Sequence, residues 1–109
     1  MQWLYWVAYV CGGALLVNAV PHVVSGVMGG RFQSPFAKPP GQGLSSSTVN
    51  VLWGSFNIAI GYLLVGRVGD FGFRNTADAL ALGLGGLAMG LFCARYFGRF
   101  HGAHTQGQP

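Results

Sequence analysis

Three apolar stretches, each long enough to cross a lipid bilayer, constrain the fold of this chain more than any other feature of its sequence. They run from Trp3 to about Met28, from about Thr48 to Gly66, and from about Thr76 to Phe97. A helix rises about 1.5 Å per residue, so roughly 20 apolar residues cross the hydrocarbon core. Helices satisfy their own backbone groups in lipid, and these runs lack the alternation typical of barrel strands. The sequence therefore predicts an all-α integral membrane protein with three transmembrane helices.

Composition argues against an ordinary soluble domain. Charged residues make up 7% of the 109 residues and hydrophobic residues 51%, whereas soluble domains carry about 25% charged residues. The formal net charge is +4, but the six basic residues are spread singly along the chain and form no basic stripe that would favour nucleic acid. We therefore expect the lipid bilayer as the surroundings of this chain and no nucleic-acid partner.

We expect a single transmembrane domain, residues 1–97, followed by a polar tail without stable structure, residues 98–109. No positively charged segment precedes Trp3, so the first span is interpreted as a retained helix rather than a signal peptide. Three spans place the first loop and the tail on the same side of the membrane. That side carries more of the basic residues: Arg31, Lys38, Arg95 and Arg99 against Arg67 and Arg74. The positive-inside rule then predicts an outside N-terminus and a cytoplasmic C-terminus.

The connection between the first two spans, "GGRFQSPFAKPPGQGLSSS", is rich in Pro, Gly and Ser and long for a helix–helix connection. We interpret it as a crossover loop in which Phe32 and Phe36 could dip into the membrane interface and cover the end of the bundle. Ser46 or Ser47 can cap the second helix. Asn75 precedes Asp78 by three residues, the spacing of a capping box at the start of the third.

Polar residues interrupt the first two spans at helical spacing. Lipid cannot satisfy such groups, so we expect them to face protein. Because the two helices are antiparallel, the polar residues of both would meet at a similar depth, in the half of the bundle near the first loop. Trp53 lies one turn from Asn50 and could wall the cluster. The candidate ligand-binding cluster comprises Asn18, His22, Ser25, Asn50, Trp53 and Asn57.

This cluster admits three interpretations. Asn and His side chains hydrogen-bond across transmembrane helices and fix their register, which would make the cluster structural. His22 could instead ligate the metal of a haem or chlorophyll, since one neutral imidazole suffices. It could also act as a base or proton carrier, although no carboxylate lies nearby. Catalytic residues and cofactors stay unknown from the sequence, and an enzyme is the less favoured class.

No dedicated metal site is expected. His101 and His104 are three residues apart, but no third ligand lies near them in the sequence. Cys11 and Cys93 are expected to lie at different depths in the membrane, too far apart for a disulfide.

The third span carries a ladder of small residues at intervals of four, which lets another helix approach closely. We expect this packing interface to comprise Gly86, Gly90, Ala94 and Gly98. The sequence favours a small accessory or scaffold subunit that acts through helix contacts, in a homo-oligomer or with other membrane subunits. The alternative is a minimal membrane enzyme or transporter that binds a small or lipid-like ligand or cofactor around His22.

Overall fold

The computed structural model describes residues 2–101, and it is mostly helical. Helix α1 spans Gln2–Val27, α2 spans Ser47–Gly66 and α3 spans Thr76–His101. All three are long and apolar enough to cross a membrane. The predicted fold class, three long apolar helices that are candidate membrane spans, is confirmed.

The helix boundaries differ from the predicted ones mainly at the end of α3. This helix continues to His101, four residues beyond the predicted end at Phe97, so it includes residues 98–101, which the sequence places in the polar tail. The extension is held in place because the His101 ring stacks on Phe32 of the first loop, with their centroids 4.7 Å apart. The rest of the predicted tail, residues 102–109, lies outside the described residues.

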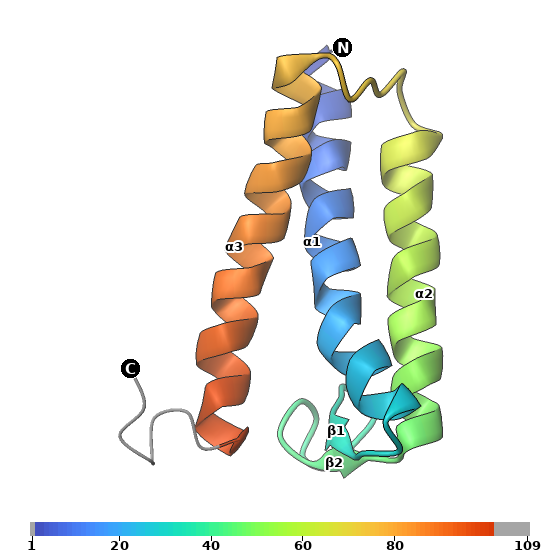
Figure 1. Ribbon diagram of the computed structural model, residues 1–109, viewed down its shortest axis with the longest axis vertical. Coiled ribbons are helices and arrows are strands. Elements are labelled where there is room, and N and C mark those ends of the chain that lie inside the picture. The colour runs from blue at the N-terminus through green and yellow to red at the C-terminus, as the bar shows by residue number, and fades with distance from the viewer. Residues whose placement is uncertain (1, 102–109) are drawn as a thin grey trace.

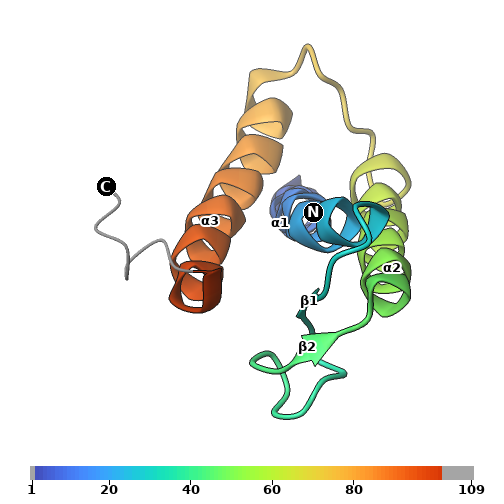
Figure 2. The ribbon, with the colours of Figure 1, turned by 60° about the horizontal axis from the view of Figure 1, so that its bottom comes forward.

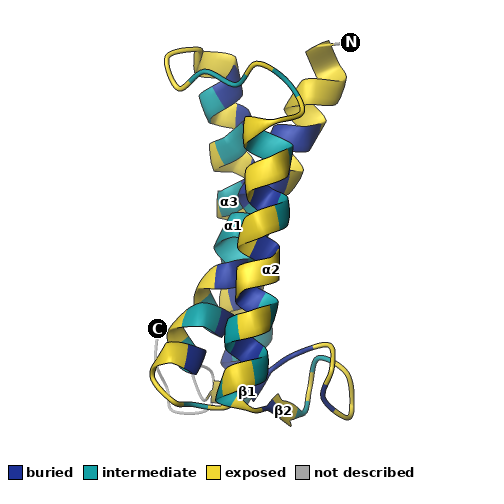
Figure 3. Ribbon diagram, turned by 90° about the vertical axis from the view of Figure 1, so that its right-hand side faces the viewer, coloured by how far each residue is buried: buried dark blue, intermediate teal, exposed yellow. Residues whose placement is uncertain are grey.

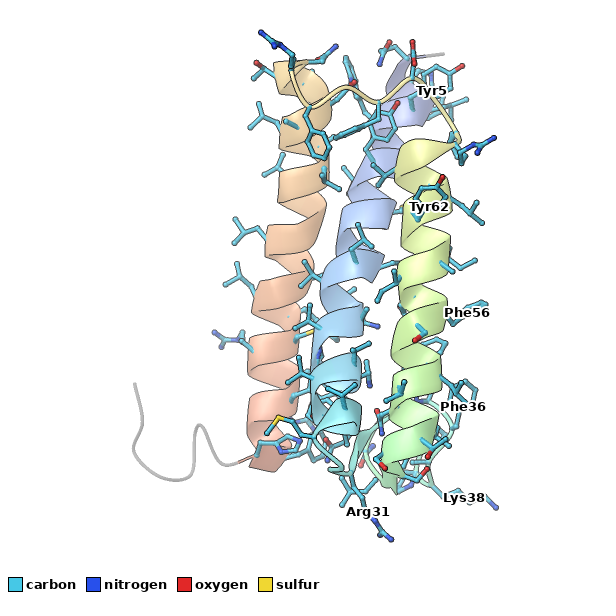
Figure 4. All side chains as sticks on the ribbon, turned by 45° about the vertical axis from the view of Figure 1, so that its right-hand side comes forward. Tyr5, Arg31, Phe36, Lys38, Phe56 and Tyr62 are labelled. Atoms are coloured by element: carbon cyan, nitrogen blue, oxygen red, sulfur yellow. The ribbon has the colours of Figure 1, made fainter. Side chains whose placement is uncertain are left out.

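Helix α1 lies between the other two helices (Figures 1 and 2). It packs along both α2 and α3, whereas α2 and α3 have little direct contact with each other. The buried faces of the helices turn inward, and exposed residues follow their outer sides (Figure 3). Exposed apolar side chains such as Phe56 and Tyr62 point outward from α2 (Figure 4), as lipid-facing residues of a membrane helix do.

Glycines set how closely the helices approach. A Cβ at Gly54 of α2 would collide with Val23 of α1, and a Cβ at Gly85 of α3 would collide with the carbonyl group of Val10. Close backbone approach of this kind is the usual basis of helix packing in membranes. Gly85 therefore marks the tightest contact between α3 and α1.

The predicted ladder on α3 lies only partly in this contact. Hypothetical Cβ atoms at Gly86 and Gly90 would reach Val17 of α1 at 3.1 and 3.7 Å. Gly98 is buried, but Ala94 is exposed. The face of α3 that packs on α1 is thus rotated from the predicted ladder toward Gly85 and Cys93, which are both buried.

The first loop is an ordered hairpin that folds across one end of the bundle (Figures 1 and 2). Strands β1, Phe32–Gln33, and β2, Leu44–Ser45, pair antiparallel, with Phe32 opposite Ser45. Between the strands, the Gly41 N–H donates to the carbonyl of Ser34 at 2.8 Å. Phe32 is buried beneath the helices.

At the opposite end, Asn75 caps α3 by accepting hydrogen bonds from the N–H groups of Ala77 and Asp78. The Asp78 carboxylate is buried and accepts bonds from the Trp6 indole at 3.1 Å and the Gly72 N–H at 3.2 Å. Asp78 thus ties α1 and the α2–α3 connection to the start of α3. The sequence correctly places Asp78 in the first turn, but the partners of its carboxylate are tertiary, and it does not bond back to the Asn75 N–H as in a capping box.

Candidate functional site

The polar residues of α1 and α2 meet at the hairpin end of the bundle in two hydrogen-bonded pairs. His22 Nδ1 lies 2.7 Å from Asn50 Oδ1, and Asn18 Nδ2 donates to Asn57 Oδ1 at 3.1 Å. The pairs form because i, i+4 and i, i+7 spacing keeps each set on one face of its helix. Ser25 does not join them: it is half-buried, and its hydroxyl has no hydrogen bond within residues 2–101.

Asn50 anchors the site because it is fully buried and both ends of its amide are used. Its Nδ2 donates to the carbonyl oxygens of Phe32 at 3.1 Å, Ser45 at 3.3 Å and Ser46 at 3.1 Å. Carbonyl oxygens only accept hydrogen bonds, so the amide nitrogen must face them and Oδ1 must face His22. Asn50 therefore joins the hairpin to α1, and these hydrogen bonds fix the orientation of its side-chain amide.

This orientation also selects the tautomer of His22. Because Asn50 Oδ1 can only accept, His22 Nδ1 must carry the hydrogen and donate it. In the neutral ring, Nε2 then carries a lone pair. No hydrogen-bond partner for Nε2 is found within the described residues.

Three aromatic rings surround the His22 imidazole. Phe32 of the hairpin, Trp53 of α2 and Phe97 of α3 meet it edge-on, with ring centroids 5.5, 6.4 and 5.8 Å away. Phe32 in turn stacks on His101. Edge-to-face packing fixes the plane of each ring relative to its neighbours, so the imidazole is held by rings on several sides as well as by Asn50.

A second polar layer lies one turn deeper along α1. Asn18 Oδ1 accepts a weak bond from the Cys93 thiol of α3, with the sulfur 3.8 Å away. Asn57 Nδ2 donates to the Trp53 carbonyl at 2.8 Å. These contacts connect all three helices at one level. Cys93 and Cys11 are both free thiols.

A cavity of about 330 Å³ opens beside His22, between α2 and α3 and against the hairpin. Its size falls at the lower end of the range for small-molecule sites. The wall combines polar groups from α1 and the hairpin with aromatic side chains from α2 and α3. The lining residues are Asn18, His22, Gln33, Ser34, Pro35, Pro40, Gly41, Trp53, Phe92, Tyr96 and Phe97.

His22 lines this cavity and is only 2% exposed. Nε2 is the ring nitrogen for which the described residues offer no hydrogen-bond partner, so it is the ring atom left to accept a hydrogen bond from a molecule in the cavity.

Two contacts hold the hairpin against α3 at the edge of the cavity. The Tyr96 hydroxyl donates to the Gly41 carbonyl at 2.7 Å. A nitrogen of His101 lies 2.7 Å from the Gln33 side-chain oxygen. The hairpin therefore covers the cavity, and these two hydrogen bonds hold it to α3.

Sequence reasoning missed the residues that α3 and the hairpin contribute. Tyr96 and Phe97 resemble an aromatic belt at the membrane interface, and nothing in their spacing shows that they turn toward His22. The place of Gln33 at the cavity could have been predicted, since it is a polar residue next to Phe32 in a loop expected to cover the bundle. Cys93 gave no signal, because a lone buried cysteine behaves as a small apolar residue.

Residues 2–101 contain no group of three His, Cys, Asp or Glu side chains arranged to hold a metal ion. The possibility that His22 ligates a haem or chlorophyll metal depends on Nε2, the ring nitrogen that Asn50 leaves available.

No family model matches this chain, and neither a curated protein nor a solved structure matches it. The chemistry of the cavity must therefore be inferred from its geometry.

Proposed function

We propose that this chain is a membrane protein that binds a small, lipid-like molecule in the cavity beside His22. One observation supports this most strongly: the buried His22 lines a cavity of about 330 Å³, and its Nε2 has no hydrogen-bond partner among the described residues. A cofactor, substrate or inhibitor that carries a hydrogen-bond donor would gain a hydrogen bond to this nitrogen.

The arrangement of the helices favours a ligand that enters from the bilayer. Helices α2 and α3 have little direct contact with each other, and the cavity between them is walled by Trp53 and Phe92. Apolar walls with few polar groups are typical of small-molecule sites. An apolar tail could lie between the two helices while a polar head reaches His22.

Binding is favoured over catalysis. The residues that line the cavity include no Asp, Glu, Lys or Arg, and the hydroxyl of the lining residue Tyr96 already donates its hydrogen to the Gly41 carbonyl. General acid–base chemistry needs a positioned proton partner within hydrogen-bond reach. We therefore propose a carrier, sensor or ligand-holding subunit rather than an enzyme.

We propose the accessory or scaffold role as a second candidate. Helices α2 and α3 both pack on α1 but have little direct contact with each other. A second copy of the chain or another membrane subunit could cover the side of the bundle between them. In either case we propose that the hairpin end faces the cytoplasm. Arg31 and Lys38 project from that end, away from the helices (Figure 4), in agreement with the positive-inside rule.

Native mass spectrometry of the gently solubilised protein tests the binding function. We expect a bound small molecule on the wild type and loss of most of it in Trp53→Ala, which removes a wall of the cavity. Tyr62→Ala is the matched control, since Tyr62 is an exposed aromatic residue of the same helix and does not line the cavity. A wild-type protein that carries no ligand, or equal occupancy in both variants, would contradict the proposal.

A further inference from the structure

The chemistry of the cavity narrows the class of ligand, if the proposed binding function holds. The first constraint is hydrogen bonding. Asn50 fixes Nδ1 of His22 as the donor, so Nε2 can only accept. The ligand must therefore carry a hydrogen-bond donor at the position that reaches Nε2.

The second constraint is charge. Apart from the imidazole of His22, the lining contains only amide, hydroxyl, backbone and apolar groups. A buried charge without an opposite partner is strongly disfavoured. The ligand group that enters the cavity should therefore be neutral.

The third constraint is shape. Trp53 and Phe97 stand edge-on around the imidazole, and Phe92 and Tyr96 stack with ring centroids 5.5 Å apart on the α3 side. Walls of flat rings pack well against another flat ring, through stacked or edge-on contacts. A planar ring therefore packs against this wall better than a flexible chain or a puckered ring does.

We propose that the cavity binds a neutral aromatic ring that bears a hydroxyl group, as phenols and quinols do, with the hydroxyl donating to His22 Nε2. An apolar tail on the ring would run between α2 and α3 toward lipid. Such a head group satisfies the three constraints together: it donates a hydrogen bond, it is uncharged and it is planar.

Calorimetric titration of the 109-residue protein in detergent, with three probes of equal tail length, tests this assignment. Para-decylphenol has both ring and hydroxyl, decylbenzene lacks the hydroxyl, and para-decylcyclohexanol lacks the planar ring. We expect the phenol to bind about fivefold to tenfold more tightly than either, the effect of one net hydrogen bond or of one aromatic contact. A fourth probe, decylhydroquinone, separates the sources: tighter binding than the phenol indicates a quinol, and equal binding a monophenol.

His22→Phe should reduce the preference for the phenol over decylbenzene to less than about twofold, because it removes the acceptor. The comparison of probes on the wild type stands even if this variant does not fold. Equal affinity of the wild type for phenol and decylbenzene, or for phenol and cyclohexanol, would overturn the assignment. If no probe binds but the native protein carries another small molecule, the proposed binding function is supported and the assignment of a hydroxyl-bearing ring is wrong. If nothing binds at all, both are wrong.

Discussion

At the scale of single residues, Asn50 determines what the site can do. It is fully buried, and its nitrogen and oxygen have opposite tasks: Nδ2 binds the carbonyl groups of the hairpin and of the start of α2, and Oδ1 accepts from His22. An amide can meet both demands, whereas a carboxylate only accepts. The amide therefore serves as a connector and at the same time sets the tautomer of the histidine.

Asn50→Asp should lower the free energy of unfolding by about 2 kcal/mol or more, because oxygen atoms would replace the donor that faces three carbonyl groups. The measurement is unfolding by SDS in mixed micelles. Asn75→Asp provides the control. Within residues 2–101, the Asn75 side chain makes hydrogen bonds through Oδ1 alone, as the cap of α3, and Asp caps a helix as well as Asn does. Similar losses in both variants would contradict the role given to Asn50.

At the scale of helices, the packing of α1 with α3 depends on which small residue faces inward. Residues 83–86 read Gly-Leu-Gly-Gly, so the sequence offers several glycines within one turn. The interval of four selects Gly86 and Gly90, but the tightest approach occurs at Gly85, against Val10. Which of the neighbouring glycines forms the closest contact depends on the orientation of the partner helix, and the residue spacing of one helix does not determine that orientation.

Gly85→Ala should therefore destabilise the bundle by about 1–3 kcal/mol, since the added methyl group meets the Val10 backbone. Gly83→Ala, two residues away, meets nothing within 4 Å and should stabilise the helix by about 0.5–1 kcal/mol. Both variants can be compared by the same SDS unfolding measurement. Opposite or equal effects would show that α3 packs on α1 through another face.

Most of the fold could be predicted from the sequence, but only part of the site. Apolar length predicts α1, α2 and α3, because lipid leaves helices as the solution for such segments. Helical spacing likewise predicts that Asn18 and His22 face polar residues of α2. The hairpin and the contribution of Phe97 could not be predicted, because they depend on tertiary packing: the stacking of Phe32 on His101 and the bond from Tyr96 to Gly41.

At the scale of the whole molecule, the two ends differ in character. The hairpin end carries the cavity and the exposed cations Arg31 and Lys38, and the other end carries the buried carboxylate of Asp78 and the exposed cations Arg67 and Arg74. If the hairpin end faces the cytoplasm, the head group of a bilayer ligand would be held near the inner surface of the membrane.

Cysteine labelling in intact cells tests this orientation. In a background with Cys11 and Cys93 replaced by Ser, Lys38→Cys on the exposed hairpin should be protected from an impermeant thiol reagent. Phe73→Cys, in the exposed α2–α3 connection, should react. The reverse pattern would invert the topology and leave the helices and the cavity unchanged.

The claim on which the binding account depends is that His22 presents an unprotonated Nε2 to the cavity. Nitrogen-15 NMR of the histidine rings in the detergent-solubilised protein measures it directly, with the His22 signals assigned by their absence in His22→Phe. We predict the shift of a protonated nitrogen at Nδ1 and of an unprotonated nitrogen at Nε2, because Asn50 Oδ1 accepts the only ring hydrogen. A His22 ring that carries its hydrogen on Nε2, or on both nitrogens, would contradict the account.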